Sequence, residues 1–494
     1  MYQDQVDGVP NASENGRGGP NRSALFINYQ QDSFALESSS AALQRAYNTR
    51  STLSGRSERL YRLSSTRIRG IQRGLARYEL RSSLPNDDAL LSPRWTVLEP
   101  LYSSLLDEFQ PDKQPYGGIF SADRAPTAEA RHYSSIAICI RELLPWGAQR
   151  TPILDASIFS LLTLYYGRLH GDAGLVGMSR SSYATALSQY HGHLDRFSSG
   201  EALGEQARQR YIGASIALQY FEHLDKVEVF DAGHQAHVDG ALKLLQLGGP
   251  ELLQGSRAFR LTISSLKPVA TYLAIHRRRP NLLSQTPWRE ESPDVEERTA
   301  RNHLFQIGLD IPALLNTADN NISARTEGVM EQDRFVDLSL HLLLEFGHLW
   351  SRLEDWLHEL TSNARSPLYW PRSQPHVVST PRIDEECGPK DRDSNHQLSF
   401  AYGTYAGLLV QYWAFQLELL MTMIDLRQAV LAHSGSSYVR KMTFDTLAEN
   451  KNMADGISQL IFEAQIYLES CLEGFICMQL PLKTVTKYFD RPHV

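Results

Sequence analysis

The stretch GHQAHVDGALKLLQLGGPELL, residues 233–253, shows the periodicity from which the fold of this chain can be predicted. Apolar side chains recur there every three or four residues, which is the spacing of one face of an α-helix. The stripe consists of His234, Val238, Ala241, Leu242 and Leu245. We therefore predict a helix that packs against a hydrophobic core through this face.

The two histidines of this stretch raise the alternative of a metal site. His234 and His237 lie three residues apart, and Asp239 follows two residues later. On a helical wheel, His234 lies at the edge of the buried stripe, whereas Asp239 projects away from it. A zinc site needs at least three protein ligands that converge on one ion. The pattern favours packing over metal binding.

Helical periodicity, interrupted by Gly and Pro, continues from about residue 92 to the end of the sequence. The fold class that we expect is all-α, with one large irregular helical domain over residues 83–494 and a surface loop at about 364–398. The expected helices are Val97–Glu108, Glu129–Leu144, Leu154–His170, Ser181–Phe197, Glu201–Leu224, His234–Leu247, Gly255–Arg277, Val329–Leu360, Ser399–His433 and Asn452–Gln479.

The composition is typical of a globular protein in a reducing compartment. The chain has 494 residues, of which 42% are hydrophobic, so it can bury a large core. Its four cysteines are widely spaced without a CxxC pair, which indicates neither a disulfide framework nor a thiolate zinc site. Apolar runs are shorter than the roughly 20 residues of a membrane helix. We expect a soluble protein without membrane contact.

Charge is distributed unevenly along the chain. The net charge is −7, but residues 41–82 contain ten arginines, no lysine and two glutamates. This basic segment therefore carries +8, and a basic arm beside an acidic body is one way to meet a polyanion. Residues 1–40, rich in Gly, Asn, Ser and Pro, are expected to be a disordered N-terminus.

Residues 64–79 of the basic segment have the pattern of an amphipathic helix, with arginines in a row apart from the apolar side chains. Such a helix could lie on DNA, on a membrane surface or against its own domain, and a solvated linker is the alternative. The candidate DNA-phosphate contacts are Arg67, Arg69, Arg73 and Arg77.

Two other segments have spacings that helical enzymes use. Asp319, Ser323 and Glu327 follow the i, i+4, i+8 pattern of terpene cyclases, but the second aspartate-rich cluster of such sites is missing. Glu345 and His348 have the E-x-x-H spacing of di-iron bundles, but a second such motif is missing. We expect no enzymatic activity, and a terpenoid-type enzyme is the disfavoured alternative.

The segment around Glu345 is better explained as one side of a long amphipathic helix. Its charged stripe is water-facing, and its apolar stripe is expected to pack. The charged stripe consists of Arg334, Asp337, His341, Glu345, His348, Arg352, Asp355 and Glu359. The apolar stripe consists of Val336, Leu340, Leu343, Phe346, Trp350, Leu353, Leu357 and Leu360.

Several segments, in order, resemble one known family. HVDGALKLLQLGG, residues 237–249, resembles the H-x-x-G-A-x-x-L-L-x-x-R-G helix of the fungal-specific transcription factor domain. This is the helical regulatory region that usually follows a Zn2Cys6 zinc cluster. The similar segments are MSRSSYATALSQYHGHL at 178–194, LAIHRRRPNLLSQTPW at 273–288, LLVQYWAFQLEL at 408–419, GISQLIFEAQIYL at 456–468 and MQLPLKTVTKYF at 478–489.

The chain also departs from the family pattern. Arg180 and Tyr190 stand where the upstream helix of the family has Ser and its last Leu. Gly248 stands where the family has Arg, and glycine lowers helix stability by about 1 kcal/mol relative to Ala. The zinc cluster needs six cysteines, and no cysteine precedes Cys139. We expect no cofactor in this chain, and zinc would enter only with a missing N-terminal cluster.

The resemblance implies a pathway-specific fungal transcriptional regulator in the nucleus, acting through its helical regulatory domain. The candidate partners are DNA, other transcription regulators, a small-molecule inducer and a second copy of the chain as a homodimer. The alternative is a co-regulator that makes no DNA contact and acts through a partner.

Overall fold

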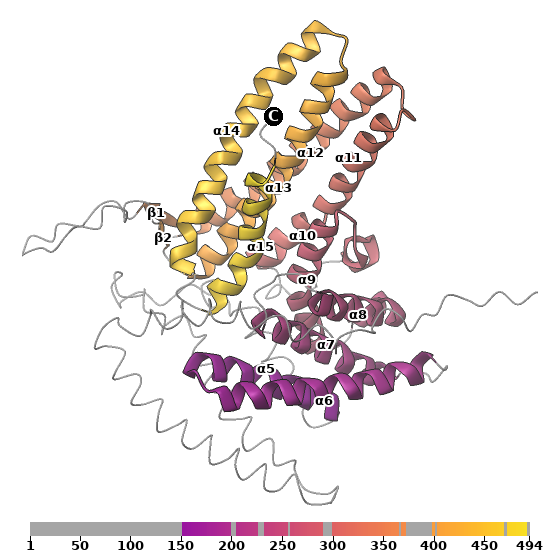
Figure 1. Ribbon diagram of the computed structural model, residues 1–494, viewed down its shortest axis with the longest axis vertical. Helices are drawn as coiled ribbons and strands as arrows, with labels where there is room; N and C mark the ends of the chain where they lie inside the picture. The colour runs from indigo at the N-terminus through magenta and orange to yellow at the C-terminus, as the bar shows by residue number, and fades with distance from the viewer. Residues whose placement is uncertain are drawn as a thin grey trace, which may run out of the picture. The chain divides into compact units, whose positions relative to one another are not determined.

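A computed structural model describes residues 151–198, 204–225, 232–254, 257–289, 299–364, 367–371, 398–400, 403–468 and 472–491, all within the unit Arg67–Val494 (Figure 1). The expected disordered N-terminus, the basic segment 41–82 and the expected helices Val97–Glu108 and Glu129–Leu144 lie outside the described residues. Helices and strands are labelled as in Figure 1, where the first labelled helix is α5.

Four helices come first among the described residues: α5 (Pro152–His170), α6 (Ala173–Ser198), α7 (Glu205–Asp225) and α8 (Ala232–Gly248). Helix α5 begins with proline at its first position, where no backbone donor is needed, and ends at Gly171 in the left-handed conformation. Its side chains from Ile153 to Tyr166 are buried, so it is a core helix between α6 and α7.

A short 3-10 helix, η7 (Pro250–Gln254), leads to α9 (Arg257–Arg277). Two further 3-10 turns, η8 (Leu282–Ser284) and η9 (Thr286–Trp288), precede α10 (Ala300–Gly308) and α11 (Ile311–Thr326). Helix α9 contacts α7, α8, α10 and α11, and it therefore joins the first four helices to the later ones.

The remaining elements are α12 (Gln332–Asn363), β1 (Tyr369–Pro371), β2 (Leu398–Phe400), α13 (Gly403–His433), α14 (Ser437–Leu468) and α15 (Leu472–Phe489). Helix α13 contacts α11, α12, α14 and α15, and it lies among them in Figure 1. It is the one described helix whose length and composition would allow it to cross a membrane, but 94% of the relevant window is buried inside the protein. Packing against its neighbours accounts for its apolar character.

The expected all-α class is confirmed for the described residues, which are predominantly helical. One difference is a two-stranded antiparallel ribbon, with Tyr369 opposite Phe400, at the ends of the expected surface loop. The rings of both residues lie against Trp413 of α13. Aromatic side chains at both loop ends thus fix the short strands, a long-range effect that local periodicity does not reveal.

The predicted helices also differ from the observed ones: α10 and α11 were not among them, and α6 begins eight residues before the predicted Ser181. The expected helix Asn452–Gln479 corresponds to the end of α14 and the start of α15, and α14 begins as early as Ser437. On α12 the most deeply buried face is rotated from the expected apolar stripe. Apolar side chains occupy a wide sector of this helix, and α10, α11 and α13 all pack against it. That face consists of Phe335, Ser339, Leu342, Phe346, Leu349, Leu353, Trp356 and Leu360.

Candidate functional site

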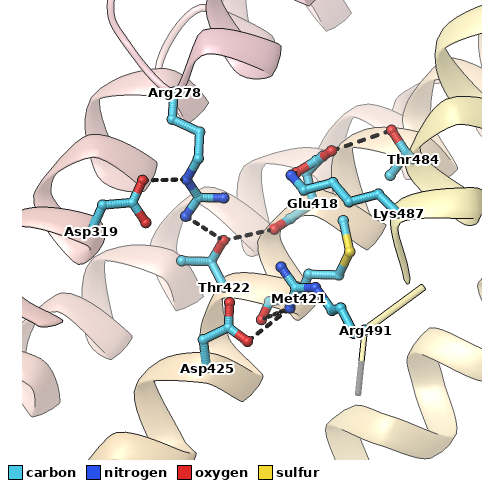
Figure 2. Close-up of polar contacts among 9 residues, drawn as sticks. All are labelled: Arg278, Asp319, Glu418, Met421, Thr422, Asp425, Thr484, Lys487 and Arg491. Carbon is cyan, nitrogen blue, oxygen red and sulfur yellow. Dashed lines mark hydrogen bonds and ion pairs between the residues drawn. The ribbon is translucent and has the colours of Figure 1, made fainter. Parts of the chain in front are cut away.

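Charged side chains from α11, α13 and α15 and from the residue that follows α9 meet along one side of α13, where most of them are partly exposed (Figure 2). Three basic residues, Arg278, Lys487 and Arg491, lie opposite three acidic residues, which come from α11 and α13. We call this set, with Thr422 and Thr484, the junction network. The acidic members are Asp319, Glu418 and Asp425.

Arg278, which follows the last residue of α9, has an unusual backbone conformation. Its φ is 52°, the one positive value at a non-glycine residue in the described part of the chain. Its backbone N–H donates to the carbonyl of Ile275, and that of Arg279 to the carbonyl of Ala274, both at 3.0 Å. This is a helix C-terminus at which glycine is the usual residue, and an L side chain there costs roughly 1–2 kcal/mol.

The side chain of Arg278 makes contacts that glycine could not make at this position. Its Nε donates to Oδ2 of Asp319 at 2.5 Å, and its Nη2 donates to Oγ1 of Thr422 at 3.1 Å. Thr422 is buried in α13, and its hydroxyl donates to the carbonyl of Glu418. One guanidinium therefore joins the end of α9 to α11 and α13 (Figure 2).

Glu418 links α13 to α15. Its side chain is only 5% exposed, and its Oε2 lies 2.9 Å from Nζ of Lys487. Oγ1 of Thr484 donates to its Oε1 at 3.3 Å. A carboxylate so far from water is stable when it is paired and hydrogen-bonded, and both conditions are met here.

Asp425 and Arg491 form a second link between α13 and the end of α15. Nη1 of Arg491 lies 2.8 Å from Oδ1 of Asp425, and it also donates to the carbonyl of Met421. Burial raises the pKa of Asp425, although the positive charges of Arg491, Arg278 and Lys487 oppose this effect. Among the three carboxylates of the network, Glu418 is the buried one, whereas Asp425 and Asp319 are 37% and 45% exposed.

The residue before Arg278 points to a different helix. Arg277 binds Asp239 of α8 with two parallel hydrogen bonds, 2.7 and 2.8 Å long, and also donates to Gln235. Two consecutive arginines therefore bind in opposite directions, one to α8 and one to α11 and α13. Burial, followed by the charges of Lys483 and Lys487, lowers the pKa of His276 in the same turn.

A second polar cluster lies between α6, α7 and α8. The hydroxyl of Tyr183 donates to Glu222 and lies 3.0 Å from Nε2 of His237, and Glu222 and His237 are both buried. The rings of His223 and His234 lie 5.5 Å apart beside this chain of contacts. Burial, and then the neighbouring His237, lowers the pKa of His234 to about 3.

The observed α8 can be compared with the predictions for residues 233–253. The helix is confirmed, and Asp239 projects outward as expected. His234 lies deeper than the edge that the wheel assigned to it, because α7 covers that side of α8. In the described part of the chain, no group of three or more His, Cys, Asp or Glu side chains could hold a metal ion.

Gly248 is the last residue of α8, and Gly249 follows with a left-handed φ of 76°. A Cβ at Gly248 would lie 2.1 Å from Cδ1 of Leu252 and 2.9 Å from Arg208. A side chain at Gly248 would therefore displace the side chains of Leu252 in η7 and Arg208 in α7, which lie close to the end of α8.

The other sequence-predicted residues lie apart from each other or outside the described part. Asp319 is paired with Arg278, whereas Ser323 is exposed and Glu327 follows the last residue of α11. His341 and His348 are exposed on α12, as the charged stripe predicted. The arginines proposed for DNA contact, Arg67, Arg69, Arg73 and Arg77, lie outside the described residues.

Sequence reasoning missed the partners of the arginines. Glu418, Thr484 and Lys487 lie in segments that carry the family resemblance, but no charge pattern in those segments indicated a polar network. The three consecutive arginines from Arg277 were the available signal. Comparisons with protein-family models, with curated proteins and with solved structures found no match.

Proposed function

We propose that this chain is a fungal transcriptional regulator that acts through its helical domain. The observation that carries the proposal is that polar contacts of the Tyr183 cluster, of Arg277 and of the junction network connect five of the six segments in which the family resemblance lies, all but residues 456–468. These segments are far apart in sequence, and a regulatory domain with this order of motifs needs them to form one unit.

The connections run through the domain from one such segment to the next. Tyr183 of residues 178–194 contacts His237 of residues 237–249. Asp239 of that same segment binds Arg277 of residues 273–288. These two contacts join the first three segments.

The later segments follow through α13. Arg278 binds Thr422, which lies one turn after Glu418 on α13. Glu418 belongs to residues 408–419, and it binds Lys487 of residues 478–489. Glu222, Glu418 and Thr422 are buried and hydrogen-bonded. Buried, hydrogen-bonded polar groups favour one arrangement of a core, which supports a domain whose segments form one unit.

In this proposal the helical domain contacts other regulators or a small inducer, and the basic segment supplies any phosphate contact. The carriers of that contact would be Arg67, Arg69, Arg73 and Arg77. Binding through these side chains would be independent of base sequence and would weaken steeply with salt.

The test is transcription from a reporter promoter to which the full chain is tethered by a heterologous DNA-binding domain. We expect a several-fold change in transcript relative to the tether alone, whether activation or repression. Unchanged transcript with a stable, nuclear fusion protein contradicts the proposal.

Duplex binding by the purified chain separates the two forms of the proposal. Loss of a salt-sensitive shift after replacing the four arginines by Ala supports direct DNA contact. Capture of a zinc-cluster protein without any duplex shift supports the co-regulator form.

A further inference from the structure

Exposed apolar side chains concentrate on the first half of α14, at the end of the bundle where the α13–α14 turn lies (Figure 1). Tyr438, Met442 and Phe444 are 75%, 51% and 64% exposed. Aromatic and methionine side chains in water are unusual in such a group and are enriched at protein interfaces.

The exposed face of α14 carries a row of polar and small residues between these apolar side chains, opposite its buried face. Thr443, Leu447, Asn450 and Ala454 form the buried face of α14. The row on the opposite face has the same i, i+4, i+7, i+11 spacing, and all of its members are exposed: Lys441, Asp445, Ala448 and Asn452. Tyr438 and Met442 border this row on one side and Phe444 on the other.

Lys441 and Asp445 are the two charged residues of this row. Among the described residues, neither side chain forms an ion pair or hydrogen bond. They lie one turn apart on the same face, positive before negative along the chain. An antiparallel second copy, with its two-fold axis at the level of Thr443, would place each Lys441 opposite the partner's Asp445.

We propose that this face of α14 is a homodimer interface, occupied by α14 of a second copy of the chain in antiparallel orientation. The same flank of both helices meets in such a pair. Met442 would then pack against the partner's Met442, and Phe444 against the partner's Phe444. Ala448 leaves room for the partner's Tyr438, which stands at the same level.

The charged side chains favour the register with the two-fold axis at the level of Thr443. Two cross pairs between Lys441 and the partner's Asp445 satisfy all four charges at the centre. A register shifted by two turns toward the C-terminus would place Asp445 opposite the partner's Glu449, and Glu449 opposite the partner's Asp445. These like charges repel each other. The self-complementary pattern therefore selects both the second copy and its alignment.

The experiment measures the mass of the full chain in solution across micromolar concentrations, for the wild type and charge variants. We expect a reversible dimer that Lys441→Glu and Asp445→Lys each weaken about tenfold or more, because each places like charges opposite one another twice. The double variant K441E/D445K should restore dimerisation. Lys243→Glu is the control for the same charge change at another exposed site.

A wild-type chain that stays monomeric throughout would overturn the proposal. So would a dimer that is indifferent to Lys441→Glu, or single variants that the double exchange fails to rescue. Helix content and melting temperature establish that each variant is folded. An independent readout is Phe444→Cys, which should form a disulfide-linked dimer under mild oxidation faster than Lys243→Cys does.

Discussion

Arg278 holds a left-handed backbone at the end of α9 while its Nε donates to Oδ2 of Asp319 in α11 at a distance of 2.5 Å. The two features belong together. The left-handed residue ends the helix and turns the chain, and the long cationic side chain of Arg278 then reaches α11 and α13 from that point. The strain of the backbone is offset by contacts that glycine could not make.

This relationship predicts that Arg278→Ala and Arg278→Gly differ in stability. Both variants lose the contacts to Asp319 and Thr422, but only alanine retains the left-handed strain. We expect the glycine variant to be more stable than the alanine variant by about 1 kcal/mol. Urea denaturation of the two variants measures the difference. Equal stability, or a more stable alanine variant, would mean that the positive φ is wrong.

Glu418→Gln should destabilise the domain more than a surface change of the same kind. The change removes the buried charge that pairs with Lys487. The expected loss in the free energy of unfolding is about 2–3 kcal/mol. This is less than for a fully buried pair, because Lys487 is 38% exposed. Glu345→Gln on the charged stripe of α12 is the matched control, with an expected effect within about 0.5 kcal/mol. Comparable losses in both variants would remove Glu418 from its assigned role.

The pH dependence of stability should report His234. Because burial lowers its folded pKa to about 3, far below the value of about 6.5 in an unfolded chain, the unfolded state binds more protons between these values. The contribution of His234 to stability is therefore complete above pH 6.5 and decreases as the pH falls. A single group of this kind contributes a slope of about 1.4 kcal/mol per pH unit.

The measurement for His234 is the free energy of unfolding at pH 7.5 and 5.5 for the wild type and for His234→Asn. The variant should lose less stability on acidification than the wild type. His341→Asn, at an exposed histidine of α12, should leave the dependence unchanged. An identical pH dependence in wild type and His234→Asn would show that His234 is not buried in its neutral form.

Gly248→Ala should destabilise the protein although alanine favours helices. The gain in helix propensity is about 1 kcal/mol, but the added methyl group would meet Leu252 and Arg208 at distances that require both to move. Overpacking of this kind costs about 1–3 kcal/mol, so a small net loss in melting temperature is expected. Gly347→Ala, where a Cβ meets nothing within 4 Å, should instead be stabilising. A rise in melting temperature for both variants would contradict the close approach at Gly248.

The helical character of many segments could be predicted because their apolar residues repeat locally, whereas α10, with nine residues, and α11 were not predicted. The predicted helix His234–Leu247 and the observed α8 differ by two residues at the start and one at the end. The depth of His234 could not be predicted, since it depends on α7, which approaches from elsewhere in the sequence. The ribbon of β1 and β2 escaped prediction for the same reason, because Trp413 stabilises it from another helix.

The junction network shows a similar division between local and long-range information. The run of arginines from Arg277 was visible, but nothing in the sequence says that Arg277 and Arg278 bind to different helices. The positive φ of Arg278 ends the helical course of the backbone at this point, and its side chain reaches partners other than those of Arg277. Glu418 carried no signal, as a single glutamate in an apolar run resembles a solvent-facing position until α15 covers it.

The most direct test of a role in transcription is chromatin immunoprecipitation of the tagged full chain, combined with transcript profiles after its removal. We predict enrichment at the promoters of a defined set of genes whose transcripts change when the chain is lost, whether the chain contacts DNA itself or through a partner. Absence of promoter enrichment for a stably expressed chain, with unchanged transcripts after its removal, would contradict the proposed function.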